Sequence, residues 1–355
     1  MKDDEDNNNN TEDENKKKLI NESRTEETNR ADSSLRKSKR PPNDHILESQ
    51  GIIIGKTLGK GSFAVVKSAY DVNRKIKVAV KIILKKEANQ EYLNKFLPRE
   101  MDTMRICNHP NLISVYQLIE TTSRHFFIME FTEKGDLLEL IKQHKYIEEN
   151  LAGRWFTQLF DGITYLHDRN IAHRDIKCEN LLLDQHYTLK VSDFGFSKQV
   201  HKAKSGTVAL SETYCGSYAY AAPELLKGIA YNVFLSDVWS IGVVLYTMVY
   251  GLLPFDDSDH KKLLKQVQST VKFPSTPFVS NRCQKIILKM LAKLKVRVHL
   301  KKLGEDEWFK EQYIRRETGP PPEFPSPTKT MILDPSVVES TQRQNSQLET
   351  ESSNL

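Results

Sequence analysis

The chain has 355 residues, with 52 Lys or Arg against 47 Asp or Glu and a formal net charge of +5. Because single hydrophobic cores stop growing near about 250–300 residues, this length predicts one large domain with additional segments at its ends. The charges are nearly balanced, so neither nucleic acid nor membrane is expected as a partner. The four cysteines lie far apart, without the spacing of a disulfide framework or a zinc site.

The ends of the chain are polar. Residues 1–48 and 317–355 contain few apolar side chains, and both predict disordered tails that cannot offset the entropy of ordering. No apolar signal segment or run of about 18 uncharged apolar residues is present, so we expect a soluble cytoplasmic protein. The basic run from Arg36 to Arg40 is a solvated charge run, a docking spot for anions or a nuclear address, which would add the nucleus as a second location.

The region between the tails changes its periodicity along the chain. Short β-branched runs at 52–54, 65–66 and 78–83 are separated by Gly, Asp and Asn, which predicts an antiparallel meander. Further on, apolar residues recur at intervals of three and four, notably across 151–166 and 238–248. That spacing predicts amphipathic and buried helices for the rest of the region.

Two glycine-bearing strings compete for a phosphate-binding role. The string from Gly51 to Thr57 resembles the end of a P-loop, but three residues separate its glycines instead of four and strand-like residues follow. This spacing argues against a P-loop ATPase. The string from Gly59 to Val66 lies between strand-like runs, where small residues let the backbone amides of a hairpin approach phosphate oxygens. Ala64 takes the position of the third expected glycine, and the string alone is also compatible with a plain tight turn.

Lys81 ends the string Val-Ala-Val-Lys, whose alternation points Ala79 and Lys81 to the same side of a strand. A lysine that grips the α and β phosphates of a nucleotide needs a carboxylate to hold it, and Glu100 is the best candidate. Pro98 fits an early turn of the helix that carries Glu100, because its missing N–H is not needed there. Without these partners, Lys81 and Glu100 would be ordinary solvent-facing side chains.

Two strings further along carry the residue types that phosphoryl transfer needs. His173 to Asn180 reads His-Arg-Asp-Ile-Lys-Cys-Glu-Asn, and an Asp-Phe-Gly string begins at Asp193. Asp175 can orient an attacking hydroxyl, and Lys177 can hold phosphate charge. Asn180 and Asp193 can hold a divalent metal. Each of these Asp and Asn residues could by itself be an ordinary loop-capping residue. Ordinary loop caps rarely occur at all of these spacings together.

From about Ile52 to Phe309, nearly three quarters of the chain, the sequence resembles a eukaryotic protein kinase, with the strings above followed by Ala222-Pro223-Glu224. Finer features, among them Cys178 where many kinases have Pro, look like the testis-specific serine kinases, a branch near the calcium/calmodulin and AMP-activated kinases. The resemblance implies an α+β, two-lobed fold with a β-rich N-lobe and a mainly helical C-lobe, a kinase domain at 52–309, and a role in sperm development.

The resemblance also implies ATP and Mg²⁺ as cofactors and gives roles to matching positions. Asp175 would orient the substrate hydroxyl, Lys177 would neutralise the γ-phosphate, and Asn180 and Asp193 would ligate Mg²⁺. The residues expected around the nucleotide are Leu58, Gly59, Lys60, Gly61, Ser62, Phe63, Ala64, Val65, Val66, Ala79, Lys81 with Glu100 behind it, Glu130, Thr132 and Leu182.

Protein substrates and an upstream activating kinase are the expected partners. Lys177 and Ser217 would both lie beside Asp175, which favours a Ser or Thr acceptor. Asp136 and Glu179 resemble carboxylates that bind an arginine three residues before the acceptor, although exposed acids near a cleft are also ordinary.

A phosphate on Thr213 would bridge Arg174 and Lys198, order the loop and switch the enzyme on. Ser205, Thr207 and Ser211 lie in the same loop and compete for this role.

Two structural contacts and two alternatives complete the resemblance. Asp237 would bind the backbone of the His-Arg-Asp string, and Glu224 would pair with Arg297, although the acidic residue usual before that arginine is missing. A scaffold or pseudokinase is disfavoured because Lys81, Asp175 and the metal aspartate are present. A small-molecule kinase of similar fold is disfavoured by the long segment that ends at Glu224, which suits a peptide platform.

Overall fold

The computed structural model describes residues 44–61, 64–200, 210–211 and 216–320. Contacts divide the chain into a small unit of residues 1–54 and 70–76 and a large unit of residues 55–69 and 77–355.

The small unit contains helix α2 (Asp44–Ser49) and the turn between two strands. Leu47 in α2 is fully buried, which explains why residues 44–48 are helical although the sequence suggested a disordered tail up to residue 48. Gly51 follows with a φ of 76°, and a Cβ there would lie 2.8 Å from the side chain of Asn73. The Asn73 amide donates a hydrogen bond to the Gln50 carbonyl at 3.0 Å.

A five-stranded sheet forms the first part of the region between the two polar ends. Its strands are β1 (Ile52–Lys60), β2 (Ala64–Asp71), β3 (Ile76–Leu84), β4 (Val115–Glu120) and β5 (Arg124–Glu130), in the order β1-β2-β3-β5-β4. β5 pairs antiparallel with both β3 and β4. β1, β2 and β3 lie side by side in chain order, as the predicted meander requires. The π-helical turn η1 (Tyr92–Phe96) and helix α3 (Leu97–Ile106) connect β3 to β4.

Helices dominate the remainder, as the periodicity predicted. They are α4 (Leu137–His144), α5 (Glu149–Asp168), α6 (Pro223–Leu226), α7 (Val233–Tyr250), α8 (His260–Gln266), α9 (Asn281–Met290), α10 (Leu300–Leu303) and α11 (Glu307–Thr318). The short elements between them are β6 (Ile171–Ala172), η2 (Cys178–Asn180), β7 (Leu181–Leu183), β8 (Leu189–Val191), β9 (Lys198–Gln199) and η3 (Tyr218–Tyr220). α11 extends two residues into the expected C-terminal tail.

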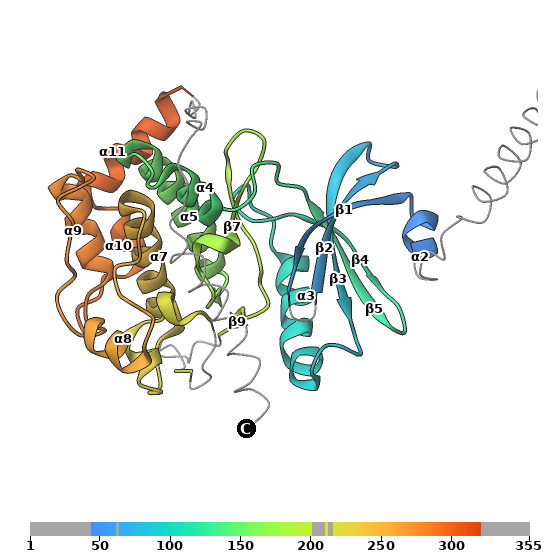
Figure 1. Cartoon of the computed structure of the whole chain (residues 1–355), viewed down its shortest axis with the longest axis horizontal. Helices are drawn as coiled ribbons and strands as arrows, with labels where there is room; N and C mark the ends of the chain where they lie inside the picture. The colour runs from blue at the N-terminus through green and yellow to red at the C-terminus, as the bar shows by residue number, and fades with distance from the viewer. Residues whose placement is uncertain (1–43, 62–63, 201–209, 212–215, 321–355) are drawn as a thin grey trace, which may run out of the picture. The chain divides into compact units, whose positions relative to one another are not determined.

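Helix α7 is a core helix that contacts α5 and α9 (Figure 1). It is long and apolar enough to span a membrane by length and composition, but 94% of its 18-residue window is buried inside the protein. Gly242 lets α9 approach, because a Cβ at this position would lie 2.8 Å from the Cβ of Met290. The buried Trp239 and the carboxylate of Asp237 also belong to α7.

A buried ion pair ties the Ala-Pro-Glu segment to the C-terminal helices. Arg297 donates to both carboxylate oxygens of Glu224, at 2.6 and 3.0 Å, and both side chains are almost inaccessible. Arg297 also donates to the carbonyls of Leu235 and Ala292, each at 3.0 Å. The predicted pair is confirmed, and backbone carbonyls serve the arginine where the usual acidic residue is missing.

Replacing Arg297 by alanine leaves the Glu224 charge buried without its partner. Loss of one member of a buried pair typically destabilises by about 3–5 kcal/mol, and we expect Arg297→Ala to lower the free energy of unfolding by that amount in urea titrations. Lys301→Ala is the control, since its pair with Asp168 at 2.8 Å is 75% and 47% exposed and should contribute less than about 1 kcal/mol. Equal losses in the two variants would contradict the assignment.

Candidate active site

Lys81 lies on β3, opposite Phe127 of β5. Its Nζ is 2.6 Å from Oε1 of Glu100 and 3.4 Å from Oδ1 of Asp193. Burial disfavours the charge on Lys81, but the carboxylates of Asp193 and Glu100 outweigh it and raise the lysine pKa well above its usual value. The predicted pairing of Lys81 with Glu100 is confirmed, and Asp193 joins it.

Glu100 occupies the first turn of α3, close behind Pro98, as the sequence predicted. Its side chain is completely buried. Burial raises the pKa of the Glu100 carboxyl, while Lys81 opposes that shift. The second oxygen, Oε2, accepts a hydrogen bond from the hydroxyl of Tyr92 at 3.1 Å. Sequence analysis missed Tyr92, because no motif marks it.

The loop from His173 to Asn180 is anchored by Asp237 of α7. Oδ2 of Asp237 accepts from the backbone N–H of His173 and Oδ1 from that of Arg174, both at 2.9 Å. Arg174 has a φ of 68°, in the left-handed region that a residue with a Cβ rarely adopts. The two hydrogen bonds hold the backbone in this conformation, and the contact expected for Asp237 is confirmed.

Asp175 is nearly buried and held in one orientation by its neighbours. Its Oδ2 lies 3.1 Å from Nζ of Lys177 and accepts a hydrogen bond from Nδ2 of Asn180 at 3.0 Å. Lys177 also donates to the hydroxyl of Ser217 at 3.0 Å. Although burial opposes the charge, Asp175 raises the pKa of Lys177. Lys177 thus lies beside Asp175, as expected, and links it to Ser217.

The β7–β8 hairpin brings the two expected metal ligands to one end. Leu181 pairs with Val191, so Asn180 and Asp193 stand just outside the paired residues. The amide nitrogen of Asn180 is committed to Asp175, which turns its amide oxygen to other partners. In the described part of the chain no cluster of three or more His, Cys, Asp or Glu could hold a metal. One amide and one carboxylate oxygen fit Mg²⁺, which usually takes one or two protein oxygens together with substrate phosphates and water.

Asp193 has a φ of 60° and a partly exposed carboxylate. Lys81 is the main influence on this carboxylate and lowers its pKa, against the effect of burial. The ionised form that a metal or lysine partner requires is therefore the favoured one.

Most of the other residues expected at the nucleotide lie on neighbouring strands of the five-stranded sheet, and one lies on the separate β7–β8 hairpin. Leu58, Gly59 and Lys60 belong to β1, Ala64, Val65 and Val66 to β2, and Ala79 to β3, with Leu182 on β7. Gly61 closes the β1–β2 hairpin by donating to the Ala64 carbonyl at 2.8 Å. Ser62 and Phe63 lie outside the described residues.

Glu130 ends β5, with Thr132 two residues later, and its side chain is engaged within the protein. Oε1 lies 2.6 Å from Nζ of Lys190 on β8, and Oε2 accepts from the backbone N–H of Ser114. These contacts fix the end of a strand that was expected to lie at the nucleotide. Lys190 was not predicted, since its partner depends on how β5 and β8 meet.

The guanidinium of Arg174 is only partly hydrogen-bonded. Its Nε donates to the Phe196 carbonyl at 2.8 Å, while its two terminal nitrogens are buried without a hydrogen-bond partner among the described residues. Lys198 on β9 donates to the hydroxyl of Ser211 at 3.2 Å. The proposed switch residue Thr213, with Ser205 and Thr207, lies outside the described residues.

Asp136 and Glu179 are two half-buried carboxylates. Asp136 caps α4 by accepting from the N–H of Glu139 at 2.9 Å. Burial raises the pKa of both carboxyls, and the charge of Asp136 adds to the shift at Glu179. Neither forms an ion pair within 4 Å in the parts of the chain that the structure describes. A cationic group would relieve this unfavourable charge density.

Comparison with known proteins agrees with this geometry. A family model described as protein kinase domain matches residues 52–309. Human testis-specific serine/threonine-protein kinase 4 is 46% identical over 274 residues, which cover 74% of this chain and 84% of that protein. Mouse testis-specific serine/threonine-protein kinase 2 is 45% identical over 267 residues, 74% of this chain and 75% of that protein.

More distant relatives include CBL-interacting protein kinase 32 of Oryza sativa subsp. japonica, 36% identical over 265 residues that cover 74% of this chain and 60% of that protein. The β-rich and helical halves, the match over most of the chain and the serine/threonine kinases among its relatives lead to one conclusion. This chain belongs to the protein kinase family and is a protein serine/threonine kinase.

Proposed function

We propose that this kinase transfers the γ-phosphoryl group of ATP to Ser and Thr hydroxyls of protein substrates. The observation that carries the proposal is the convergence of charged and amide groups from separate elements. Lys81 contacts Asp193 on one side of the site, and Asp175 contacts Lys177 and Asn180 on the other. Phosphoryl transfer depends mainly on such positioning and charge stabilisation.

Asp175 orients the substrate hydroxyl and accepts its proton. Its Oδ2 is occupied by Lys177 and Asn180, so Oδ1 is the atom that can meet the hydroxyl. Gly216 adjoins this atom, and a Cβ at Gly216 would lie 3.4 Å from Oδ1 and 2.7 Å from the Arg174 carbonyl. The missing side chain lets the substrate-binding segment approach the loop closely.

Lys81 binds the α and β phosphates, and Lys177 neutralises charge on the γ-phosphate. Asn180 and Asp193 hold Mg²⁺, which supplies positive charge to the phosphate oxygens when it is bound. The predicted nucleotide residues of β1, β2, β3 and β7, with the backbone at Glu130 and Thr132, form the ATP site.

Phosphorylation of Thr213 activates the enzyme in this proposal. The buried terminal nitrogens of Arg174 support it, because a phosphate supplies the acceptors that they lack within the described residues. An upstream kinase or the enzyme itself supplies the phosphate.

A role in sperm development follows from the testis-specific relatives, whose names give their tissue. We place the protein in the cytoplasm, with the basic run from Arg36 to Arg40 as a route to the nucleus. Neither acidic nor basic residues predominate strongly enough to add a membrane or nucleic acid to its partners.

Asp175→Asn should bind ATP but transfer phosphate about 10²–10⁴-fold more slowly, since it removes the proton acceptor. Radiolabel incorporation into a basic protein with Mg²⁺ and ATP measures the rate, and calorimetry measures binding. Asp168→Asn makes the same chemical change at an exposed ion pair and should remain active. Nucleotide binding without turnover in the unmodified protein would instead favour a scaffold.

Thr213→Ala should lower activity at least about tenfold, because the variant cannot carry the phosphate that would bind Arg174. A tenfold loss corresponds to the free energy of about one charge-assisted hydrogen bond. Mass spectrometry of the purified enzyme should find phosphate on Thr213, with Ser205→Ala and Thr207→Ala as controls. Full activity of Thr213→Ala in the peptide assay would refute the switch.

Peptides with arginine three residues before the acceptor should be preferred, because Asp136 and Glu179 supply carboxylates for the guanidinium. Glu179→Gln should raise KM for such a peptide about tenfold and leave KM for a peptide with alanine at that position unchanged. Glu139→Gln, at an exposed acid of α4, serves as the control. A uniform effect on both peptides would contradict recognition of arginine.

A further inference from the structure

The buried carboxylate of Glu100 has two donors, one on each oxygen. Nζ of Lys81 lies 2.6 Å from Oε1, and the Tyr92 hydroxyl donates to Oε2 at 3.1 Å. We propose that Tyr92 is a positioning residue of the active site, whose hydroxyl holds the Glu100 carboxylate in the orientation that pairs with Lys81. The inference rests on the proposed binding of ATP phosphates by Lys81.

Two donors on two oxygens fix a carboxylate against rotation about its last bond. If the Tyr92 hydroxyl is removed, Oε2 is left in a fully buried site with an unmet need for a donor. The carboxylate can then lower its free energy by rotating toward other hydrogen-bond donors, and this rotation weakens its contact with Lys81. Lys81 also faces Asp193 at 3.4 Å, so a weaker hold by Glu100 shifts its ammonium toward the other carboxylate.

Tyr92 is itself held in place at the start of η1. Its backbone N–H donates to the side-chain oxygen of Asn89 at 2.7 Å, and the N–H of Leu93 donates to the Asn89 carbonyl at 3.1 Å. η1 is a π-helical turn that runs directly into α3. Such turns are rare and frequently occur at functional sites. Tyr92 lies in this turn, eight residues before Glu100, and the two side chains are in contact.

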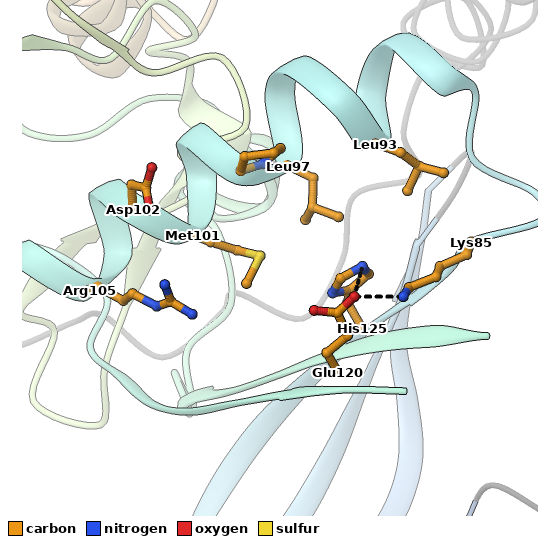
Figure 2. Close-up of a pocket in the computed structure, with 9 residues that line it drawn as sticks. Lys85, Leu93, Leu97, Met101, Asp102, Arg105, Glu120 and His125 are labelled. Atoms are coloured by element: carbon orange, nitrogen blue, oxygen red, sulfur yellow. Dashed lines mark hydrogen bonds and ion pairs between the residues drawn. The ribbon is translucent and has the colours of Figure 1, made fainter. Parts of the chain in front are cut away.

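An adjacent face of η1 and α3 offers less restraint. Leu93, Leu97 and Met101 line a cavity of about 380 Å³, whose far side carries Glu120 of β4 and His125 of β5 (Figure 2). Side chains that line a cavity lack contact partners on one side and hold their helix less firmly than close packing does. The position of η1 and α3 therefore depends more on their polar links to the active-site side.

A second link on that side comes from Thr103 of α3. Its hydroxyl lies 2.8 Å from the hydroxyl of Ser197, and both residues are buried. Phe96 also meets Phe196 edge to face, with ring centroids 5.5 Å apart. These contacts tie η1 and α3 to the segment after Asp193. The Tyr92 bond, in contrast, acts directly on Oε2 of Glu100, the carboxylate oxygen that does not contact Lys81.

Tyr92→Phe keeps the ring and removes only the hydroxyl. We expect kcat/KM for ATP to fall about tenfold, equivalent to about 1.4 kcal/mol, while KM for the peptide and the urea midpoint stay close to those of the unmodified enzyme. Tyr246→Phe is the matched control, because it removes a hydroxyl that donates to the Lys272 carbonyl at 2.8 Å and, within the described residues, to no active-site side chain. Unchanged ATP kinetics in Tyr92→Phe would overturn the proposal.

A double-mutant cycle separates positioning from packing. Calorimetry gives the ATP dissociation constants of the unmodified chain, Tyr92→Phe, Glu100→Gln and the double variant, without any need for turnover. Tyr92→Phe should weaken ATP binding in the unmodified chain and have little further effect beside Glu100→Gln, where no carboxylate remains to be oriented. Equal losses in both backgrounds would overturn the proposal. If the unmodified chain binds ATP but transfers no phosphate, the proposed function fails and the cycle still decides the role of Tyr92.

Discussion

The structure depends on one largely buried cation shared by two carboxylates. Lys81 of β3 lies between Glu100 of α3 and Asp193, which follows β8. An ammonium taken out of water needs such partners, because burial without them disfavours the charged form strongly. The positions of β3, α3 and the segment after β8, which are distant in the sequence, therefore depend on one another. Any movement of α3 must alter the charge environment of Lys81 and, through it, of Asp193.

A second buried carboxylate, that of Asp237, anchors the catalytic loop to the helices. Asp237 accepts hydrogen bonds from two backbone N–H groups and lies 2.8 Å from Nε2 of His167. Nearly all residues of its helix, α7, are buried, so the carboxylate rests on a rigid base. This rigidity lets Arg174 keep a left-handed backbone and sets the directions of the residues that follow it. Close packing thus determines catalytic geometry through a single side chain.

The sequence predicted those features that depend on local order. Periodicity identified the first three strands and α7, and motif spacing paired Lys81 with Glu100 and Glu224 with Arg297. Features that depend on where elements meet were missed. Tyr92 and Lys190 carry no local sequence signal. Each contacts a carboxylate that is distant in the sequence, on α3 or β5, and comes near it only in the folded structure. The short helix α2 was missed because one buried apolar side chain is too weak a pattern in a polar segment.

The same arrangement leaves donors of the Arg174 guanidinium unused. Its two terminal nitrogens are buried without a partner in the described residues, and each such donor costs about 1–3 kcal/mol. The backbone at this residue is strained as well, and strain of this kind costs about 1–3 kcal/mol more. Asp237 and the Phe196 carbonyl offset only part of this cost. An anion that reached the guanidinium would remove the rest, so the loop that carries Asp175 would be more stable in the phosphorylated enzyme than without the phosphate.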